Sequence, residues 1–150
     1  IPRHINRSKN IINNLKDDNL NVITHSSGKK LKKNTDIYLV DTYGEASRFY
    51  SLSKVTFMGG SMIKHGGQNP LEPARLGNYI ISGPNIENFK EIYKFLEKNK
   101  MSTRTSNTTK IKKIINMRLN KKLSNHNKEK IFRIGDKILN KNISCISKYI

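Results

Sequence analysis

The chain has 150 residues, and its 29 basic and 11 acidic residues give a formal net charge of +18. This length suits one domain with a substantial core. No window approaches the roughly 20 apolar residues of a membrane span, no signal peptide is visible, and the single cysteine, Cys145, excludes an internal disulfide.

The positive charge first suggests a nucleic acid or an anionic membrane surface as a partner. Aromatic residues are not interleaved with basic ones in the manner that stacks bases, and lysines outnumber arginines 22 to 7, so nucleic acid is not expected. The excess charge is concentrated late in the chain. Residues 101–150 hold 13 basic and 2 acidic residues, against 16 and 9 in residues 1–100.

The first hundred residues alternate short apolar runs, which predict buried strands, with apolar residues at helical spacing. This alternation is typical of a parallel, doubly wound α/β sheet, in which ligands bind beyond the carboxyl ends of the strands. In chain order we expect a strand end at 1–4, a helix at 5–15, a strand at 20–24, a lysine-rich loop at 26–34, a strand at 37–40, a helix at 45–53, a strand at 55–58, a short helix at 70–76, a strand at 79–81 and a helix carrying Phe89, Ile92, Tyr93 and Leu96.

The stretch from Gly59 to Pro73, G-G-S-M-I-K-H-G-G-Q-N-P-L-E-P, holds four of the nine glycines. It joins a predicted strand to a predicted helix start, and that order builds an anion site, because glycines admit a ligand close to the backbone and the first helical N–H groups point at it. Asn69 suits the N-cap and Pro70 the first helical position.

Glu72 lies three residues after the expected cap and has two interpretations. It is either a capping-box carboxylate that reaches back to the Asn69 N–H, or an acceptor for the sugar hydroxyls of a ligand. The local sequence leaves both open.

Residues 101–150 differ in character from the rest of the chain. Residues 101–109 are polar, with a weak edge-strand pattern at 101–104. Lysine-rich faces on the helices that follow are interpreted as solvated, with anionic lipid headgroups as the alternative partner. The apolar residues that define these two amphipathic helices are Ile111, Ile114, Ile115 and Leu119 in the first and Ile131, Ile134 and Ile138 in the second.

Taken together, the loops resemble the C-terminal domain of 3-deoxy-D-manno-octulosonic acid (Kdo) transferases. Six pieces occur in the order and at the spacing of that family, and they cover about residues 1–100. They are P-R-H at 2–4, D-T-Y-G-E at 41–45, F-M-G-G-S at 57–61, G-G-Q-N-P-L-E-P at 66–73, G-P at 83–84 and N-F-x-E-I at 88–92.

The resemblance implies a GT-B glycosyltransferase with two Rossmann-like domains. Such enzymes transfer Kdo from CMP-Kdo to a lipid A precursor, with inversion and without a catalytic metal or cofactor, at the cytoplasmic face of the bacterial inner membrane in lipopolysaccharide biosynthesis. Residues 1–100 would form the Rossmann-like CMP-Kdo-binding domain, and residues 101–150 basic C-terminal helices of the same domain. The tail is the candidate contact with the membrane surface.

By the family pattern, nine residues would line the CMP site, and no catalytic residue or metal ligand is expected in this chain. A guanidinium such as that of Arg3 suits a phosphate or a pyrimidine carbonyl, with a surface salt bridge as its structural alternative. The N–H groups of the helix start would hold the phosphate, Glu72 the ribose hydroxyls, and Gly44 would admit the base or ribose. The nine are Pro2, Arg3, Tyr43, Gly44, Glu45, Asn69, Pro70, Leu71 and Glu72.

Three departures from the family pattern concern the surroundings of the Kdo unit. Gln68 and Asn85 stand where the family commonly has histidine, and Ile5-Asn6-Arg7 stands in place of P-E-R. None of these touches the nine residues expected at CMP.

The family also has an N-terminal membrane-anchoring segment and an N-terminal domain that carries the general base and the acceptor site, and neither is in this sequence. The strand before Pro2 is nearly all missing as well. We therefore expect this chain alone not to transfer Kdo. It is expected to be either the C-terminal part of an interrupted gene or a piece cut from a longer enzyme. The alternative is an inactive remnant, or a donor-binding domain that works only beside a separate N-terminal chain. The rival class is a basic nucleic-acid or membrane-surface protein.

Overall fold

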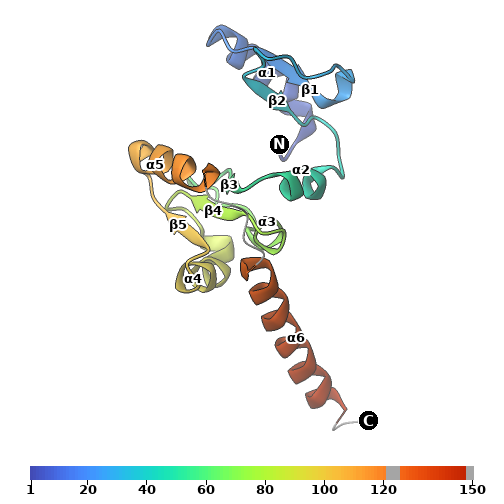
Figure 1. The fold of residues 1–150 in the computed structure, drawn as a ribbon, viewed down its shortest axis with the longest axis vertical. Helices are drawn as coiled ribbons and strands as arrows, with labels where there is room; N and C mark the ends of the chain where they lie inside the picture. Colours follow the sequence, from blue (N-terminus) through green and yellow to red (C-terminus); the bar gives the residue numbers. More distant parts are fainter. Residues whose placement is uncertain (121–125, 148–150) are drawn as a thin grey trace. The chain divides into compact units, whose positions relative to one another are not determined.

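The structure is a computed structural model that describes residues 1–120 and 126–147. The chain divides into two compact units, Ile1–Phe49 and Tyr50–Ile150, whose elements are labelled in Figure 1. Among the described residues, no helix is both long and apolar enough to cross a lipid bilayer. Each unit is built from parallel strands and helices, which confirms the predicted α/β class.

The first unit contains a helix followed by two parallel strands. A 3₁₀ turn at Ile5–Arg7 leads into α1, Ser8–Asp17. Strands β1, Val22–Thr24, and β2, Ile37–Leu39, pair in parallel with Val22 opposite Ile37. Helix α2, Ala46–Leu52, begins in this unit and crosses into the next.

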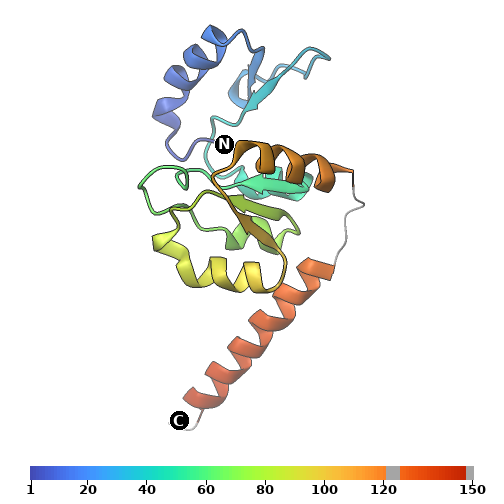
Figure 2. The ribbon, with the colours of Figure 1, turned by 90° about the vertical axis from the view of Figure 1, so that its left-hand side faces the viewer.

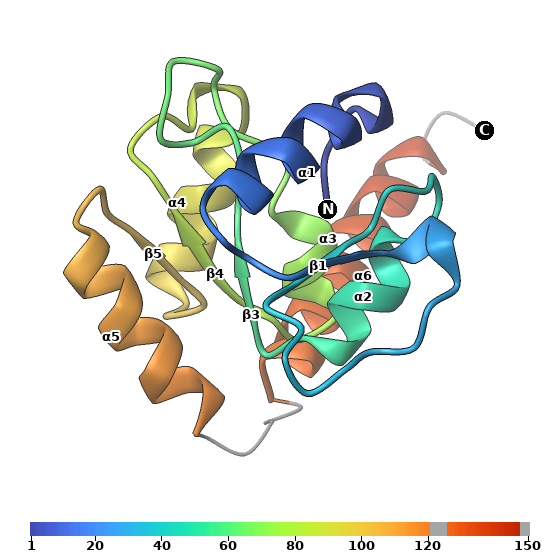
Figure 3. The same ribbon diagram turned by 90° about the horizontal axis from the view of Figure 1, so that it is seen from above.

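The second unit is a three-stranded parallel sheet flanked by helices. Its strands are β3 (Val55–Phe57), β4 (Tyr79–Ser82) and β5 (Ser102–Arg104), and they lie side by side in that order (Figure 3). The helices are α3 (Leu71–Arg75), α4 (Lys90–Lys98), α5 (Thr108–Leu119) and α6 (His126–Ile146).

The core of the second unit lies on both faces of β4, whose four residues are all buried. Ile80 packs with Tyr93 and Leu96 of α4, whereas Ile81 packs with Ile114 of α5. Figure 2 shows α4 and α5 on opposite sides of the sheet. Side chains alternate along a strand, so a strand covered by helices on both faces must be apolar at successive positions, as Tyr-Ile-Ile is here.

Helix α6 adds to the α4 side of this core. Ile131 is buried in the same cluster as Ala74 of α3, and the Arg75 guanidinium lies 5.4 Å from the centre of the Phe132 ring. Ile134 and Ile138, which the sequence also predicts on the apolar face of this helix, have side chains outside the described ones.

The predicted elements agree with the structure to within a few residues except at 1–4, where a strand end was expected and the backbone is irregular. The weak pattern at 101–104 proves to be the edge strand β5. The strands pair into two sheets, β1-β2 and β3-β4-β5, rather than into one continuous sheet. The expected division into residues 1–100 and 101–150 of one domain stays a prediction.

Candidate functional site

The predicted anion loop follows β3, which ends at Phe57, and contains Ser61, a fully buried residue to which the sequence assigned no role of its own. Its hydroxyl donates to the Met58 carbonyl at 2.6 Å and accepts from the Gly83 N–H at 2.8 Å. Its carbonyl accepts from the backbone N–H and the side-chain amide of Asn85, at 3.0 and 3.2 Å. Ser61 therefore ties the loop after β3 to the loop after β4.

Gly83 has no space for a side chain at this junction. A Cβ built on Gly83 would lie 2.3 Å from the Ser61 carbonyl oxygen, closer than any real Cβ contact. Where two backbone segments come this close, only glycine fits, because it has no Cβ. The G-P piece of the family pattern thus has a packing reason as well as any functional one.

A second tie holds the glycine pair at the other end of the loop. Gly66 and Gly67 both have φ of +72°, a conformation that other residues rarely adopt. The Gly66 carbonyl accepts from the Asn88 N–H at 3.2 Å, and the His65 carbonyl from the Asn88 side-chain amide at 3.3 Å. The glycines let the chain turn back toward Asn88 before α3 begins.

Gln68 is held by its backbone rather than its side chain. Its carbonyl accepts from the hydroxyl of Tyr93, a fully buried side chain of α4, at 3.2 Å. Burial raises the pKa of Tyr93 to about 12, so this hydroxyl keeps its proton at neutral pH. This contact is independent of whether the residue carries glutamine or the histidine common in the family.

The start of α3 lies one residue later than the sequence predicts, with Pro70 rather than Asn69 at the N-cap position and Leu71 as the first helical residue. The Asn69 side-chain oxygen accepts from the Leu71 N–H at 3.0 Å, while Pro70 is buried with φ of −86°. The helix ends with Gly77 at φ of +94°, where the Asn78 N–H bonds the Pro73 carbonyl at 3.0 Å. Both ends of this five-residue helix are therefore fixed by local hydrogen bonds.

Glu72 lies on the exposed side of α3, near the phenol of Tyr50. Burial first, and the negative charge of Glu72 second, raise the pKa of Tyr50. An exposed carboxylate on the first turn of a helix is accessible to a ligand, so the capping and sugar-binding interpretations of Glu72 both remain predictions.

In the first unit, the loops after β1 and β2 are joined by Asp41. Its carboxylate accepts from the Ser26 N–H at 2.9 Å and the Ser26 hydroxyl at 2.6 Å. Burial acts to raise the pKa of Asp41, but the Ser26 hydrogen bonds outweigh it and hold that pKa below its usual range. Asp41 thus fixes the start of the Tyr43-Gly44-Glu45 turn without belonging to the nine residues expected at CMP.

The turn itself is open. The Tyr43 side chain is 78% exposed, and a Cβ on Gly44, whose φ is +83°, would meet nothing within 4 Å. Glu45 lies 3.7 Å from Arg48 in an exposed ion pair. The hydroxyl of Thr42 is buried without a hydrogen-bond partner, so a polar group beside the turn is left for a ligand or water to satisfy.

Pro2 and Arg3 precede the 3₁₀ turn at the start of the chain, and Arg3 is exposed. Within the described part of the chain the Arg3 guanidinium makes no ion pair, so the salt-bridge alternative is not observed. The nine expected residues fall into two groups. Pro2, Arg3, Tyr43, Gly44 and Glu45 belong to the first unit and Asn69, Pro70, Leu71 and Glu72 to the second, so their convergence on one ligand stays a prediction.

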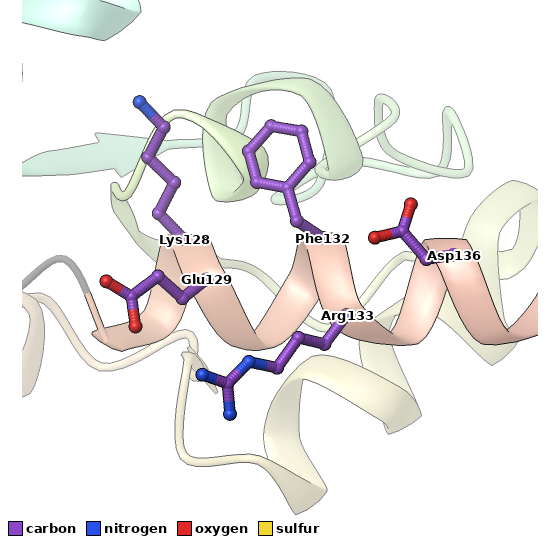
Figure 4. Close-up of a pocket in the computed structure, with 5 residues that line it drawn as sticks. All are labelled: Lys128, Glu129, Phe132, Arg133 and Asp136. Atoms are coloured by element: carbon purple, nitrogen blue, oxygen red, sulfur yellow. The ribbon is translucent and has the colours of Figure 1, made fainter.

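The described residues also contain a hollow of about 380 Å³ beside α6, far along the chain from the nine residues. Figure 4 shows Phe132 and Arg133 pointing to opposite sides of the helix, so the lining side chains do not converge. The residues that line this hollow are Lys128, Glu129, Phe132, Arg133 and Asp136. Over the described part of the chain, no group of three or more histidine, cysteine, aspartate or glutamate residues is placed to hold a metal ion.

Comparison with known proteins gives a consistent result, although no model of a protein family matches. The chain is 34% identical over its full length to a 3-deoxy-D-manno-octulosonic acid transferase of Rickettsia felis, of which it covers 33%. It is 38% identical over 64% of its length to the enzyme of that name from Haemophilus influenzae, of which it covers 22%. The chain thus spans about a third or less of these relatives.

A solved structure matches as well. It is the C-terminal CMP-Kdo binding domain of WaaA from Acinetobacter baumannii, with a TM-score of 0.75 and 28% identity. The match covers 93% of this chain and 71% of that one. Relatives and fold agree with the six sequence pieces, and the chain belongs to the Kdo transferase family, corresponding to its C-terminal domain.

Proposed function

We propose that this chain is the donor-binding part of a Kdo transferase, which moves Kdo from CMP-Kdo to a lipid A precursor with inversion and without a metal. The observation that carries the proposal is the likeness to a solved CMP-Kdo binding domain over 93% of the chain. The nine site residues fall on the family's motifs, in loops that the structure leaves accessible or fixes by hydrogen bonds.

The four residues at the start of α3 would meet the charged part of the donor. The Asn69 N–H would hold the CMP phosphate, joined by the Leu71 N–H once the Asn69 side chain, which accepts from it in this structure, gives way. Glu72 would accept from the ribose hydroxyls. Since α3 has only five residues, directed N–H groups rather than a large helix dipole would supply the stabilisation. Backbone donors that meet a phosphate charge do not require a metal ion.

Residues of the first unit would complete the nucleotide site. The exposed guanidinium of Arg3 would bind the phosphate or a pyrimidine carbonyl. The turn of Tyr43, Gly44 and Glu45 would receive the base or ribose, since the open space above Gly44 lets a ligand approach the backbone.

Calorimetry with CMP tests the proposal. Glu72→Ala should weaken CMP binding about tenfold, because a charged hydrogen bond to a sugar hydroxyl contributes roughly 1.5–3 kcal/mol. Glu87→Ala, which removes a carboxylate elsewhere on the second unit, is the matched control and should bind as the parent does. Absence of CMP binding by folded protein, or an unchanged affinity in Glu72→Ala, would contradict the proposal.

We propose that the chain alone does not transfer Kdo, because the residues expected to bind the acceptor and to act as general base lie in another domain of the family. The alternative to a transferase part is a donor-binding module that needs a separate N-terminal chain, or an inactive remnant. A neighbouring reading frame that encodes the other domain would support the first, and its addition to this chain should restore transfer.

The location we propose is the cytoplasmic face of the inner membrane, with the basic tail of residues 101–150 as one candidate contact. The rival function, nucleic-acid binding through net charge, predicts an affinity that collapses steeply with added salt. CMP carries a single phosphate, so its binding should depend far less on salt. Parallel titrations at low and high salt distinguish the two.

A further inference from the structure

Residues 28–35, which we name the lysine loop, connect β1 to β2 and carry a feature that donor binding does not explain. The run reads G-K-K-L-K-K-N-T, with four lysines and no acidic residue. At its centre the Leu31 side chain is 66% exposed. A leucine that projects into water between pairs of lysines combines an apolar group with flanking positive charge.

The lysine loop has a defined backbone shape. Gly28 takes a left-handed conformation with φ of +62°. Further along, the Lys32 N–H bonds the Thr35 hydroxyl and the Thr35 N–H bonds the Lys32 carbonyl, both at 3.0 Å. These bonds close a turn immediately after Leu31.

Beneath the loop lies a cavity of about 340 Å³ within the first unit. Three lysines line it together with polar side chains that donate hydrogen bonds, and none of its described lining residues is acidic. Within the described part of the chain these lysine ammonium groups make no ion pair. The lining residues are Lys16, Leu20, Asn21, Val22, Ile23, Lys29, Lys32, Asn34 and Thr35.

The acidic residues nearest in sequence do not line this cavity, although Asp36 bonds the lining residue Asn21. The Asp36 carboxylate accepts from the Asn21 N–H at 2.8 Å and from its side-chain amide at 3.0 Å. Asp17 and Asp18 follow Lys16 but are not among the lining residues. A cavity lined by three lysines is suited to a phosphate group.

The cavity lies apart from the residues expected at CMP. It is lined by Leu20 to Ile23, at the amino end of β1, whereas the Tyr43 to Glu45 turn follows the carboxyl end of β2. The two strands are parallel, so these are opposite edges of the same sheet. An anion bound under the lysine loop would not compete with the donor.

We propose that the lysine loop docks this chain on an anionic lipid bilayer, with a headgroup phosphate between Lys29 and Lys32 and the Leu31 side chain in the interfacial region. Exposed Leu31 favours a bilayer over a free anion, because a soluble phosphate uses no projecting apolar side chain. Peripheral binding needs such a pair of signals, one apolar and one electrostatic. The proposal does not depend on CMP binding.

Vesicle co-sedimentation of the whole chain tests it, with phosphatidylcholine vesicles that contain or lack about one third phosphatidylglycerol. The chain should bind the anionic vesicles only. Lys29→Gln with Lys32→Gln should weaken binding about 25-fold, at roughly fivefold for each lysine, and Leu31→Ser should weaken it several-fold. Lys90→Gln with Lys98→Gln, an equal loss of charge on exposed residues of α4, is the matched control and should stay within about twofold. Lys110→Gln with Lys112→Gln, on exposed residues of α5, tests the tail as the rival contact.

Three outcomes would overturn the proposal. Equal weakening by the α4 control would show attraction by net charge, and weakening by the α5 variant alone would assign the surface to the tail. Release of the parent protein from vesicles by about 10 mM inorganic phosphate, an excess that would saturate a weak anion site, would identify a free anion as the ligand. Thermal unfolding of each variant checks that the fold is kept.

Discussion

Two glycines beside the same loop differ in how much space surrounds them. At Gly83 a Cβ would lie 2.3 Å from the Ser61 carbonyl oxygen, whereas at Gly59 the nearest atom, Gln68 Nε2, is 3.7 Å away. Gly83→Ala should therefore lower the free energy of unfolding by about 2–3 kcal/mol, because a backbone atom must move. Gly59→Ala is the matched control and should change it by less than about 0.5 kcal/mol. Urea denaturation measures both, and equal effects would contradict the packing argument.

Tyr93 provides a residue-scale prediction of pH dependence. The pKa of its phenol is raised from 10.0 to about 12 in the folded chain, so the folded state favours the protonated form. This contribution to stability is complete below pH 10 and is lost as the pH rises toward 12. Between pH 9 and about 11.5, the parent should lose unfolding free energy more steeply than Tyr93→Phe.

The same variant also tests the hydrogen bond to the loop. Tyr93→Phe leaves the Gln68 carbonyl without this donor, which should cost about 1 kcal/mol at neutral pH. A difference between parent and variant that does not change with pH would show that the phenol is not perturbed as described.

At the scale of elements, the start of α3 has two roles. The Asn69 side chain bonds the Leu71 N–H, and the same segment is the expected site of the CMP phosphate. One substitution separates the two. Asn69→Asp keeps an oxygen acceptor for the Leu71 N–H, so the unfolding free energy should stay within about 0.5 kcal/mol of the parent. It also places a negative charge where the CMP phosphate is expected, and CMP affinity should fall at least about tenfold. Asn69→Ala, the control, should cost about 1 kcal/mol of stability. Unchanged CMP affinity in Asn69→Asp would place the phosphate elsewhere.

The sequence predicted elements best where local chemistry decides them. The apolar run of β4, the cap at Asn69 and the stop at Gly77 follow from periodicity and from residue types with a known conformational role. Strand β5 was weak in the sequence because Ser102-Thr103-Arg104 is polar, and it is ordered by pairing with β4. The ties made by Ser61 and Tyr93 could not be predicted, since they join residues about 20 or more positions apart and depend on the folded path of the loops.

For the candidate site, the sequence motifs were more informative than the fold about which residues to expect. Residue types in family motifs supplied the nine expected positions, which stay predictions, while the structure shows what holds the loops that carry them. Asp41 fixes the turn of the first unit, and Ser61 and Asn88 fix the loop before α3. Asn85, noted in the sequence only as a departure from histidine, is one of these ties, because its amide donates to the Ser61 carbonyl.

At the scale of the whole molecule, the proposed function requires both units to meet one nucleotide. Hydrogen exchange with and without CMP should then show slower exchange in two separate segments, around Gly44 and around Leu71. The segment around Leu31 should be unchanged, because the lysine loop lies at the opposite edge of the β1-β2 sheet from the expected donor site, and it serves as the internal control. Protection confined to one unit would contradict a shared CMP site.

The order of strands in the second unit affects how the sheet of this unit folds. Strands β3, β4 and β5 neighbour each other in the order in which they occur in the chain, so each new strand pairs with the one just completed. The paired residues are nevertheless far apart in sequence, with Val55 opposite Tyr79 and Ile80 opposite Ser102, so this parallel pairing forms more slowly than contacts within a helix. As the chain leaves the ribosome, the sheet can grow from its β3 edge one strand at a time, with α5 and α6 arriving last to cover apolar faces that already exist.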